Sequence, residues 1–154
     1  MQRITPFLTY NDKAEDAATF YIRLFHDSSI TKTTYYPESS SMPKGSVMTV
    51  EFELANQKYV ALNGGPHFTF TEGFSLSVSC TTQAEIDELW DKLTANGGQP
   101  GQCGWLKDQF GLSWQITPAN IGQLLQSNDP ARAQRKMAAM LQMHKIDISA
   151  LEQA

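Results

Sequence analysis

A pattern of four apolar residues occurs twice in this 154-residue chain, 69 positions apart. Both copies have the spacing i, i+3, i+4, i+7, which places four side chains on one face of a helix. The first copy is Ala17, Phe20, Tyr21 and Leu24, and the second is Ile86, Leu89, Trp90 and Leu93. Each copy follows a segment with the spacing of a capping box, at Asp12–Glu15 and Thr82–Glu85. The duplication predicts two similar modules, each with one helix packed on a sheet.

Segments typical of β-strands surround both predicted helices. Met48–Leu54 alternates apolar and polar residues, which is the pattern of a strand with one buried face. A short reversal and a returning strand at Tyr59–Asn63 follow, so a hairpin is expected. The other expected strands are Arg3–Tyr10, Ile30–Tyr36, Phe74–Cys80, Gln102–Lys107 and Leu112–Thr117. Together these elements predict an α+β fold over residues 1–117, in which two βαβββ modules (about 3–66 and 72–117) form cup-shaped mixed sheets within one domain.

Residues 118–154 have the pattern of a helical C-terminal extension. Asp129 and Pro130 are suited to the N-cap and the first turn of a helix. The apolar residues that follow are Met137, Met140, Leu141 and Met143. Flexible thioether side chains adapt to irregular surfaces, so we expect this extension at a homodimer contact, with packing inside the same chain as the alternative. The basic residues Arg132, Arg135, Lys136 and Lys145 are interpreted as a solvated helix face.

The charge balance and the hydropathy exclude two classes of partner. Lys and Arg number 12 against 16 Asp and Glu, so the net charge of −4 gives no broad positive field for nucleic acid or anionic lipid. No segment approaches the ~18 apolar residues that would span a bilayer. The start of the chain also lacks a secretion signal, and its two cysteines have no disulfide-framework or zinc-site spacing. We therefore expect a cytoplasmic protein without nucleic-acid or membrane partners.

Several segments carry a resemblance to a known family. They are Phe7–Tyr10, Ala17–Phe25, Ala61–Pro66, Gln102–Asp108 and Gly111–Gln115. With them, the chain resembles the PhnB-like (demethylubiquinone methyltransferase-like) branch of the vicinal oxygen chelate superfamily, over about residues 3–151. That superfamily also holds glyoxalase I, bleomycin-resistance proteins and extradiol dioxygenases. The resemblance implies two βαβββ modules, a homodimer, and a ligand or metal held inside the cup.

Metal enzymes of the superfamily place a His and a Glu from each module on strands that face the cup, where they bind a divalent ion. The resemblance places other residues at these positions. They are Thr5, Gly73 or Phe74, Ala61 or Asn63, and Gln115. We therefore expect no bound catalytic metal and no other cofactor.

The methyltransferase activity named in the label of this branch would require a particular local structure. Binding of S-adenosylmethionine in a Rossmann-like sheet needs a glycine-rich turn directly after a strand and before a helix. Gly64–Gly65 is followed by Pro66, whereas Gly97–Gly98 follows a predicted helix. Neither glycine pair has the required context, so the sequence does not support this label.

Five residues are candidates for binding a small organic ligand: Gln115, Asn63, His67, Trp105 and Trp114. Gln115 stands where relatives carry a ligating Glu and offers an uncharged donor and acceptor. Asn63 can orient a ligand in the same way, although turn chemistry also explains an Asn beside glycines. His67 is a potential general base or an ordinary loop histidine. Trp105 and Trp114 are either aromatic walls or core residues.

Two functions fit these residues. The first is a small-molecule-binding protein of the glyoxalase/bleomycin-resistance type, PhnB-like, without the usual metal ligands. The alternative is an enzyme acting on a small organic substrate as a lyase, isomerase, dioxygenase or methyltransferase. The missing ligands favour the first, but strand register decides which polar groups face the cup, and periodicity does not fix it.

Overall fold

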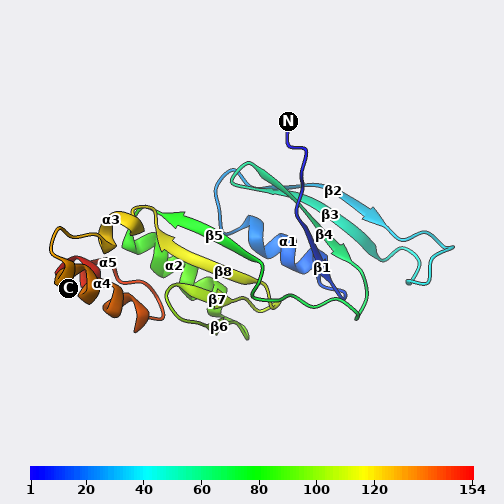
Figure 1. Cartoon of the computed structure of the whole chain (residues 1–154). Coiled ribbons are helices and arrows are strands. Elements are labelled where there is room, and N and C mark those ends of the chain that lie inside the picture. Colours follow the sequence, from blue (N-terminus) through cyan, green and yellow to red (C-terminus); the bar gives the residue numbers. More distant parts are fainter. The chain divides into compact units, whose positions relative to one another are not determined.

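Each half of the chain folds into a four-stranded mixed sheet with one helix against one face, as the computed structural model of residues 1–154 shows (Figure 1). Residues Met1–Thr69 form unit 1 and Phe70–Ala154 form unit 2. The strand order is β1-β4-β3-β2 in unit 1 and β5-β8-β7-β6 in unit 2. The first two strands of each order are parallel and the other pairs are antiparallel. The predicted α+β fold of two βαβββ modules is therefore confirmed.

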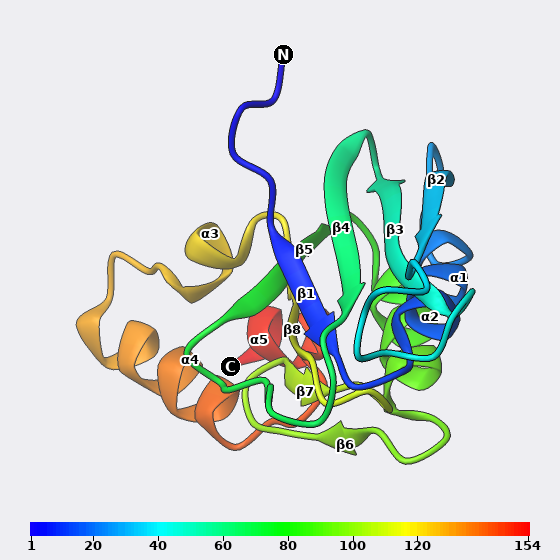
Figure 2. The same cartoon turned by 90° about the vertical axis from the view of Figure 1, so that its right-hand side faces the viewer.

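Unit 1 has the expected order of elements. They are β1 (Phe7–Tyr10), α1 (Ala14–Ile22), β2 (Ser29–Tyr35), β3 (Val47–Leu54) and β4 (Gln57–Asn63). Strand β1 lies beside β4, and the two are paired from Phe7 with Val60 to Tyr10 with Asn63 (Figure 2). Ala55 and Asn56 join β3 to β4 with φ values of 47° and 66°. Two successive positive φ angles are what a two-residue hairpin turn requires, so the predicted reversal is confirmed.

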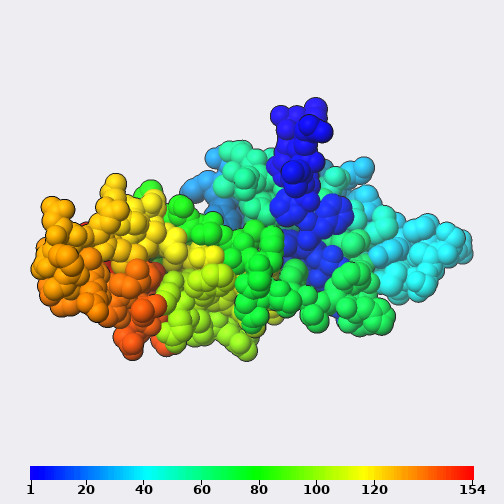
Figure 3. Space-filling model, viewed as in Figure 1, coloured from blue at the N-terminus to red at the C-terminus, as the bar shows by residue number.

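The core of unit 1 lies between α1 and the sheet. Small residues of α1, among them Ala14, Ala17 and Ala18, are fully buried and let the helix approach the strands closely. Phe52 on β3 lies near the rings of Tyr21 and Tyr59, at centroid distances of 6.4 and 5.6 Å. The helix is shorter than its apolar pattern predicts, because it ends at Ile22 and leaves Leu24 beyond it. In Figure 3 the first residues of the chain stand out from the body of unit 1, which agrees with the exposure of Met1 and Ile4.

Unit 2 repeats this arrangement. Its elements are β5 (Ser75–Cys80), α2 (Gln83–Thr94), β6 (Gln99–Pro100), β7 (Trp105–Lys107) and β8 (Ser113–Pro118). Helix α2 begins 69 residues after α1, which equals the offset of the apolar pattern. All four predicted apolar positions of α2 are buried. Strand β6 has only two residues and carries no periodic signal, so it was not predicted.

The C-terminal extension is helical, as expected, and folds within unit 2. It contains α3 (Ile121–Leu125), α4 (Pro130–Leu141) and α5 (Ile148–Gln153). The predicted start of α4 is confirmed, because the Asp129 carboxylate accepts the Ala131 N–H at 3.1 Å. Leu124, Ile146 and Leu151 form its buried cluster. No helix in the structure is both long and apolar enough to cross a membrane.

The basic and the apolar side chains of the extension differ in burial from what their pattern predicts. Lys136 does not lie on a solvated face: it is 7% exposed, and its ammonium donates to the Leu124 carbonyl at 3.0 Å. The carbonyl group at the end of α3 thus compensates a charge that the basic pattern alone would place in water. Met140 and Met143 pack against the buried cluster, whereas Met137 and Leu141 are exposed.

Candidate functional site

The N-terminus of α1 is capped by a side chain of β4, the last strand of the same module. Asn63, the last residue of β4, accepts the Ala14 N–H through Oδ1 at 2.9 Å and donates from Nδ2 to the Val47 carbonyl at 3.0 Å. Its side chain therefore bridges α1 and β3, and the residue is only 7% exposed. The predicted capping box is wrong here, because Lys13 is the N-cap and no local side chain caps the helix. Asp12 has no hydrogen bond to the helix backbone.

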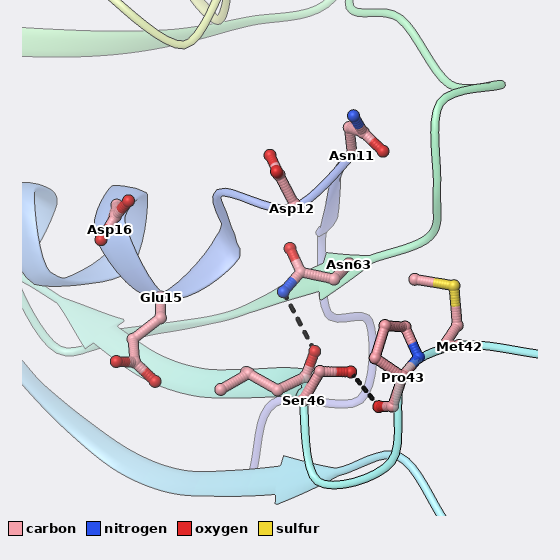
Figure 4. A pocket seen from close by; sticks show the side chains of 9 residues that line it. Asn11, Asp12, Glu15, Asp16, Met42, Pro43, Ser46 and Asn63 are labelled. Carbon is pink, nitrogen blue, oxygen red and sulfur yellow. Dashed lines mark hydrogen bonds between the residues drawn. The ribbon is translucent and has the colours of Figure 1, made fainter. Parts of the chain in front are cut away.

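A pocket of about 310 Å³ lies beside this cap (Figure 4). It is lined by Asn11, Asp12, Glu15, Asp16, Met42, Pro43, Ser46, Val47 and Asn63. The loop on its far side is held in place by Tyr36, whose hydroxyl donates to the Asn63 carbonyl and whose N–H donates to the Ser46 carbonyl. Acidic residues in the first turn of a helix are stabilised by the helix dipole, which accounts for Glu15 and Asp16 without a ligand.

The sheet of unit 2 has two chemically different faces. Because side chains alternate along a strand, Trp114 and Ile116 of β8 share the face packed by α2, and Gln115 lies on the opposite face. Gln115 is paired with Trp105 on β7 and with Ser77 on β5. Its Nε2 donates to the Ser75 Oγ at 3.0 Å. We call the surface formed by Ser75, Ser77, Trp105 and Gln115 the Gln115 face.

A buried carboxylate organises the turn between β7 and β8. Asp108 is 3% exposed and accepts the Phe110 and Leu112 N–H groups through Oδ1, at 2.8 and 3.1 Å. Its Oδ2 accepts the indole N–H of Trp114 at 2.8 Å. Trp114 is 1% exposed, so it is a core residue on the α2 side of the sheet. Sequence reasoning missed Asp108, although an Asp three residues before Gly111 is a signal for a side-chain-stabilised turn.

The loop Gly101–Gly104, before β7, has an unusual backbone conformation. Cys103 and Gly104 have φ values of 57° and 86°. The left-handed region costs a non-glycine residue roughly 1–2 kcal/mol, so Cys103 needs compensating contacts. Gly104 cannot be replaced without movement, because a Cβ there would lie 2.7 Å from the Ile116 carbonyl oxygen. The Cys103 and Gly104 N–H groups donate to the carbonyls of Met143 and His144, both at 2.8 Å.

Neither cysteine has the surroundings of a nucleophile. Burial and the nearby Glu85 carboxylate raise the pKa of the Cys80 thiol to about 12, so it stays protonated at neutral pH. The Cys103 thiol faces the Met140 carbonyl, with the sulfur 3.5 Å from its oxygen. Both cysteines are free thiols.

The five candidate ligand residues are therefore distributed unevenly. Gln115 and Trp105 are neighbours on the Gln115 face, and Trp114 lies on the other face of the same sheet. Asn63 belongs to unit 1, where both polar atoms of its amide already have protein partners. His67 also belongs to unit 1, on an exposed loop that follows β4.

Gln115 does not fit a divalent cation. The resemblance places it at the position of a ligating Glu, and it supplies a neutral amide that is hydrogen-bonded to the Ser75 hydroxyl. Neutral amides and hydroxyls are weaker ligands than the imidazole and carboxylate groups that hold such ions. No group of three or more His, Cys, Asp or Glu side chains in the structure is arranged to hold a metal ion.

Two solved structures of low sequence identity share the fold of this chain. A fosfomycin-resistance protein, FosX from Listeria monocytogenes, is 12% identical with a TM-score of 0.51, and the match covers 76% of this chain and 89% of that one. Protein PA1353 from Pseudomonas aeruginosa is 19% identical with a TM-score of 0.64, covering 77% and 98%. These two similarities show the fold.

The family follows from two further matches. The family model described as 3-demethylubiquinone-9 3-methyltransferase matches residues 2–117. A putative 3-demethylubiquinone-9 3-methyltransferase, a PhnB protein from Bacillus cereus, is 36% identical with a TM-score of 0.71; the match covers 77% of this chain and 100% of that one. This chain therefore belongs to the PhnB-like family, and its C-terminal extension lies outside the family match. No curated protein matches the chain.

Proposed function

We propose that this protein binds a small organic molecule against the Gln115 face without using a metal ion. The observation that carries the proposal is the pairing of Gln115 with Ser75 and Trp105. The amide and the hydroxyl offer donors and acceptors that can orient a carbonyl or hydroxyl group, and the indole ring offers an apolar wall. Ligand sites commonly combine a few oriented polar groups with such walls.

The same proposal includes a homodimer in the cytoplasm. Superfamily members bind small ligands and are often dimeric. The exposed Met137 and Leu141 of α4 are apolar residues available for a subunit contact. Small-angle scattering of the full chain and of a chain ending at Ser127 tests this: the truncated protein should lose the dimer, and a fully stable truncated dimer would contradict the contact.

Ligand-observed NMR with a benzoquinone carrying hydroxyl and methoxy groups tests the binding site. This probe has the ring, carbonyl and hydroxyl groups that the description of the family suggests. Gln115→Leu and Trp105→Ala should each weaken its binding about tenfold, because about 1.4 kcal/mol of interaction is lost. Gln134→Leu, at an exposed position of α4, is the matched control and should bind as the wild type does. Unchanged binding in both face variants would refute the site.

A methyltransferase is the second candidate, because the family description names one. Gly64–Gly65 follows β4 but precedes Pro66 rather than a helix, and Gly97–Gly98 follows α2. Neither pair forms the strand, turn and helix that hold S-adenosylmethionine in Rossmann-type enzymes. Titration calorimetry with S-adenosylmethionine should show no saturable binding at micromolar concentration. Saturable binding together with transfer of a labelled methyl group to a hydroxyquinone would establish this activity instead.

Metal dependence distinguishes the remaining enzyme reactions from the proposed metal-free binding. A lyase, isomerase or dioxygenase of this superfamily would use a divalent ion to polarise substrate oxygens. Probe turnover that is lost on treatment with EDTA and restored by Mn²⁺ would support such an enzyme. Binding without turnover, unchanged by EDTA, would support the proposed binding protein.

A further inference from the structure

The C-terminal extension makes a specific set of hydrogen bonds with the loop Gly101–Gly104. The carbonyls of Met143 and His144 accept the N–H groups of Cys103 and Gly104, as described above. The His144 side chain adds a third contact, with Nδ1 lying 2.6 Å from the Gly101 carbonyl oxygen. A carbonyl oxygen only accepts, so Nδ1 carries the hydrogen in this contact. These three hydrogen bonds, together with the contact of the Cys103 thiol with the Met140 carbonyl, join two segments that lie about forty residues apart.

The conformation of the loop depends on these bonds. Cys103 and Gly104 both have positive φ angles, which direct their N–H groups toward the extension. No backbone carbonyl of unit 2 outside the extension accepts these two N–H groups. Ile146, which is fully buried, lies against Gly104, with its Cγ1 3.1 Å from the place where a Cβ would stand. Without the extension, these two amides would lose their protein partners and Cys103 would lose the contacts that hold it in the left-handed region.

The loop in turn sets the position of Trp105. The Gly101 N–H donates to the Trp105 carbonyl at 2.8 Å, and the Trp105 N–H donates to the Gln102 carbonyl at 3.0 Å. The loop also reaches β8, because the Ile116 N–H donates to the Gly104 carbonyl at 2.7 Å. Trp105 follows the loop directly, and Ile116 follows Gln115. Trp105 and Gln115, two of the four residues of the Gln115 face, are therefore next to backbone that the loop holds.

The extension has an anchor of its own on α2, independent of the loop. The Gln83 amide donates to the Ile146 carbonyl at 3.0 Å and accepts the Ile148 N–H at 2.8 Å. The Lys145 ammonium lies 2.8 Å from an oxygen of Asp87 on the same helix. Helix α2 thus fixes the segment Met143–Ile148, and this segment fixes the loop.

We propose that the C-terminal extension is a positioning element of the ligand site: through Met143, His144 and Ile146 it holds the loop Gly101–Gly104 so that Trp105 stands beside Gln115. The proposal rests on the proposed function, because that function makes the Gln115 face a ligand site. The positioning itself concerns only the protein without ligand. The element lies outside the family match, which ends at residue 117.

Fluorine NMR of the full chain labelled with 5-fluorotryptophan tests the positioning directly. The chain has three tryptophans, so the spectrum contains three resonances, assigned by single Trp→Phe variants. Ile146→Ala and the milder Gln83→Leu should shift and broaden the Trp105 resonance while leaving those of Trp90 and Trp114 in place. Ile146→Val should restore it. Arg132→Ala is the control, because Arg132 donates only to the carbonyls of Glu152 and Ala154, away from the loop.

Amide hydrogen exchange gives a second readout. The Cys103 and Gly104 amides should be protected in the wild type and exchange at least about tenfold faster in Gln83→Leu, as expected when a local opening replaces a stable hydrogen bond. An unchanged Trp105 resonance together with unchanged exchange, in a variant whose Trp90 and Trp114 resonances are native, would overturn the proposal. If Ile146→Ala unfolds, the outcome for Gln83→Leu decides.

The benzoquinone probe separates this proposal from the proposed function. If both are correct, Gln83→Leu weakens probe binding by about the factor found for Trp105→Ala. If the wild type does not bind the probe but the Trp105 resonance still responds to the extension, the proposed function fails and the positioning stands. If the probe binds Gln83→Leu as tightly as the wild type while the resonance moves, the extension positions Trp105 without serving the site, and the proposal fails.

Discussion

The two modules satisfy the same hydrogen-bond requirement in different ways. In unit 1, the N-terminus of α1 is capped by Asn63, which lies 49 residues further along the chain. In unit 2, the N-terminus of α2 is capped locally: the Thr82 hydroxyl accepts the Glu85 N–H at 3.2 Å, and the Glu85 carboxylate accepts the Thr81 N–H at 2.9 Å. A duplicated topology therefore does not imply duplicated local chemistry.

The register of the parallel strands explains the difference. Tyr10 pairs with Asn63 at the end of the β1–β4 ladder, and Cys80 pairs with Pro118 at the end of the β5–β8 ladder. The Tyr10 and Cys80 carbonyls even accept equivalent N–H groups, those of Gly64 and Ala119, at 2.8 and 2.7 Å. Pro118 thus stands where Asn63 stands in the first module. A proline has no side-chain amide, so α2 depends on its own capping box.

The β3–β4 and β7–β8 hairpins also differ in how their turns are stabilised. Because of this difference, we expect Asp108→Ala to lower the free energy of unfolding more than any other substitution. The β3–β4 turn combines two positive φ angles with hydrogen bonds from the Ala55 and Asn56 N–H groups to the Ser28 hydroxyl and the Asp27 carbonyl, both at 3.1 Å, whereas the β7–β8 turn depends on the Asp108 carboxylate. The substitution takes away the buried carboxylate that accepts two backbone N–H groups and the Trp114 indole N–H. The free energy of unfolding should fall by about 3–5 kcal/mol, since each unsatisfied buried group costs roughly 1–3 kcal/mol. Urea unfolding monitored by tryptophan fluorescence measures this.

Asp12→Ala is the matched control for that variant. Asp12 is exposed and does not cap α1, so its loss should change the free energy of unfolding by less than about 0.5 kcal/mol. If both substitutions had similar effects, the account of the β7–β8 turn would be wrong.

Asn63→Ala and Thr82→Ala compare the two caps directly. Asn63→Ala leaves the Ala14 N–H and the Val47 carbonyl unpaired beside the core, so we expect a loss of about 2–3 kcal/mol. Thr82→Ala removes one exposed cap and should cost only about 1 kcal/mol. Asn63→Asp keeps the acceptor for Ala14 but loses the donor to Val47, so its effect should be intermediate. Equal losses for the two alanine variants, measured by urea unfolding, would contradict long-range capping.

The parts of the fold that could be predicted depend on contacts close in sequence. The apolar spacing of α2, the capping box at Thr82 and the Asp129 cap involve residues a few positions apart, and each is confirmed. The cap of α1 could not be predicted in this way, because its acceptor belongs to another element. The burial of Lys136 could not be predicted either, since a basic residue on a polar helix usually stays in water and only tertiary packing brings it to the Leu124 carbonyl.

The candidate site could also be predicted only where it depends on residues that are close in sequence. Alternation along the expected strand Leu112–Thr117 already separates Trp114 from Gln115, because adjacent residues face opposite sides of a sheet. That Trp105 pairs with Gln115 required the register of β7 and β8, which the sequence pattern does not contain. Two of the contacts between the extension and the loop Gly101–Gly104 are backbone hydrogen bonds, and these have no side-chain signal in the sequence.

The smallest expected effect concerns the ion pairs of the two helices. On α1, Asp16 pairs with Lys13 within one turn, 3.6 Å apart, whereas Asp87 on α2 pairs with Lys145 of the extension. Hydrogen bonds from Lys145 and Gln83 lower the pKa of Asp87 below its usual value of 3.8. A folded pKa below the unfolded one means that the pair stabilises the protein above pH 3.8, and that this contribution disappears as pH falls through the folded pKa.

At the alkaline end the sign is opposite. The hydrogen bond to Asp87 raises the pKa of Lys145 above 10.5, so its contribution is complete below that pH and is lost as pH rises through the folded pKa. Both side chains are more than one third exposed, which limits the effect at pH 7 to within about 1 kcal/mol. Asp87→Asn should therefore lower the free energy of unfolding slightly at neutral pH and low salt, with a difference that vanishes at both extremes. Asp16→Asn should show a smaller loss, because its pair ties no distant segment; an equal loss would mean that Lys145 does not help to hold the extension on α2.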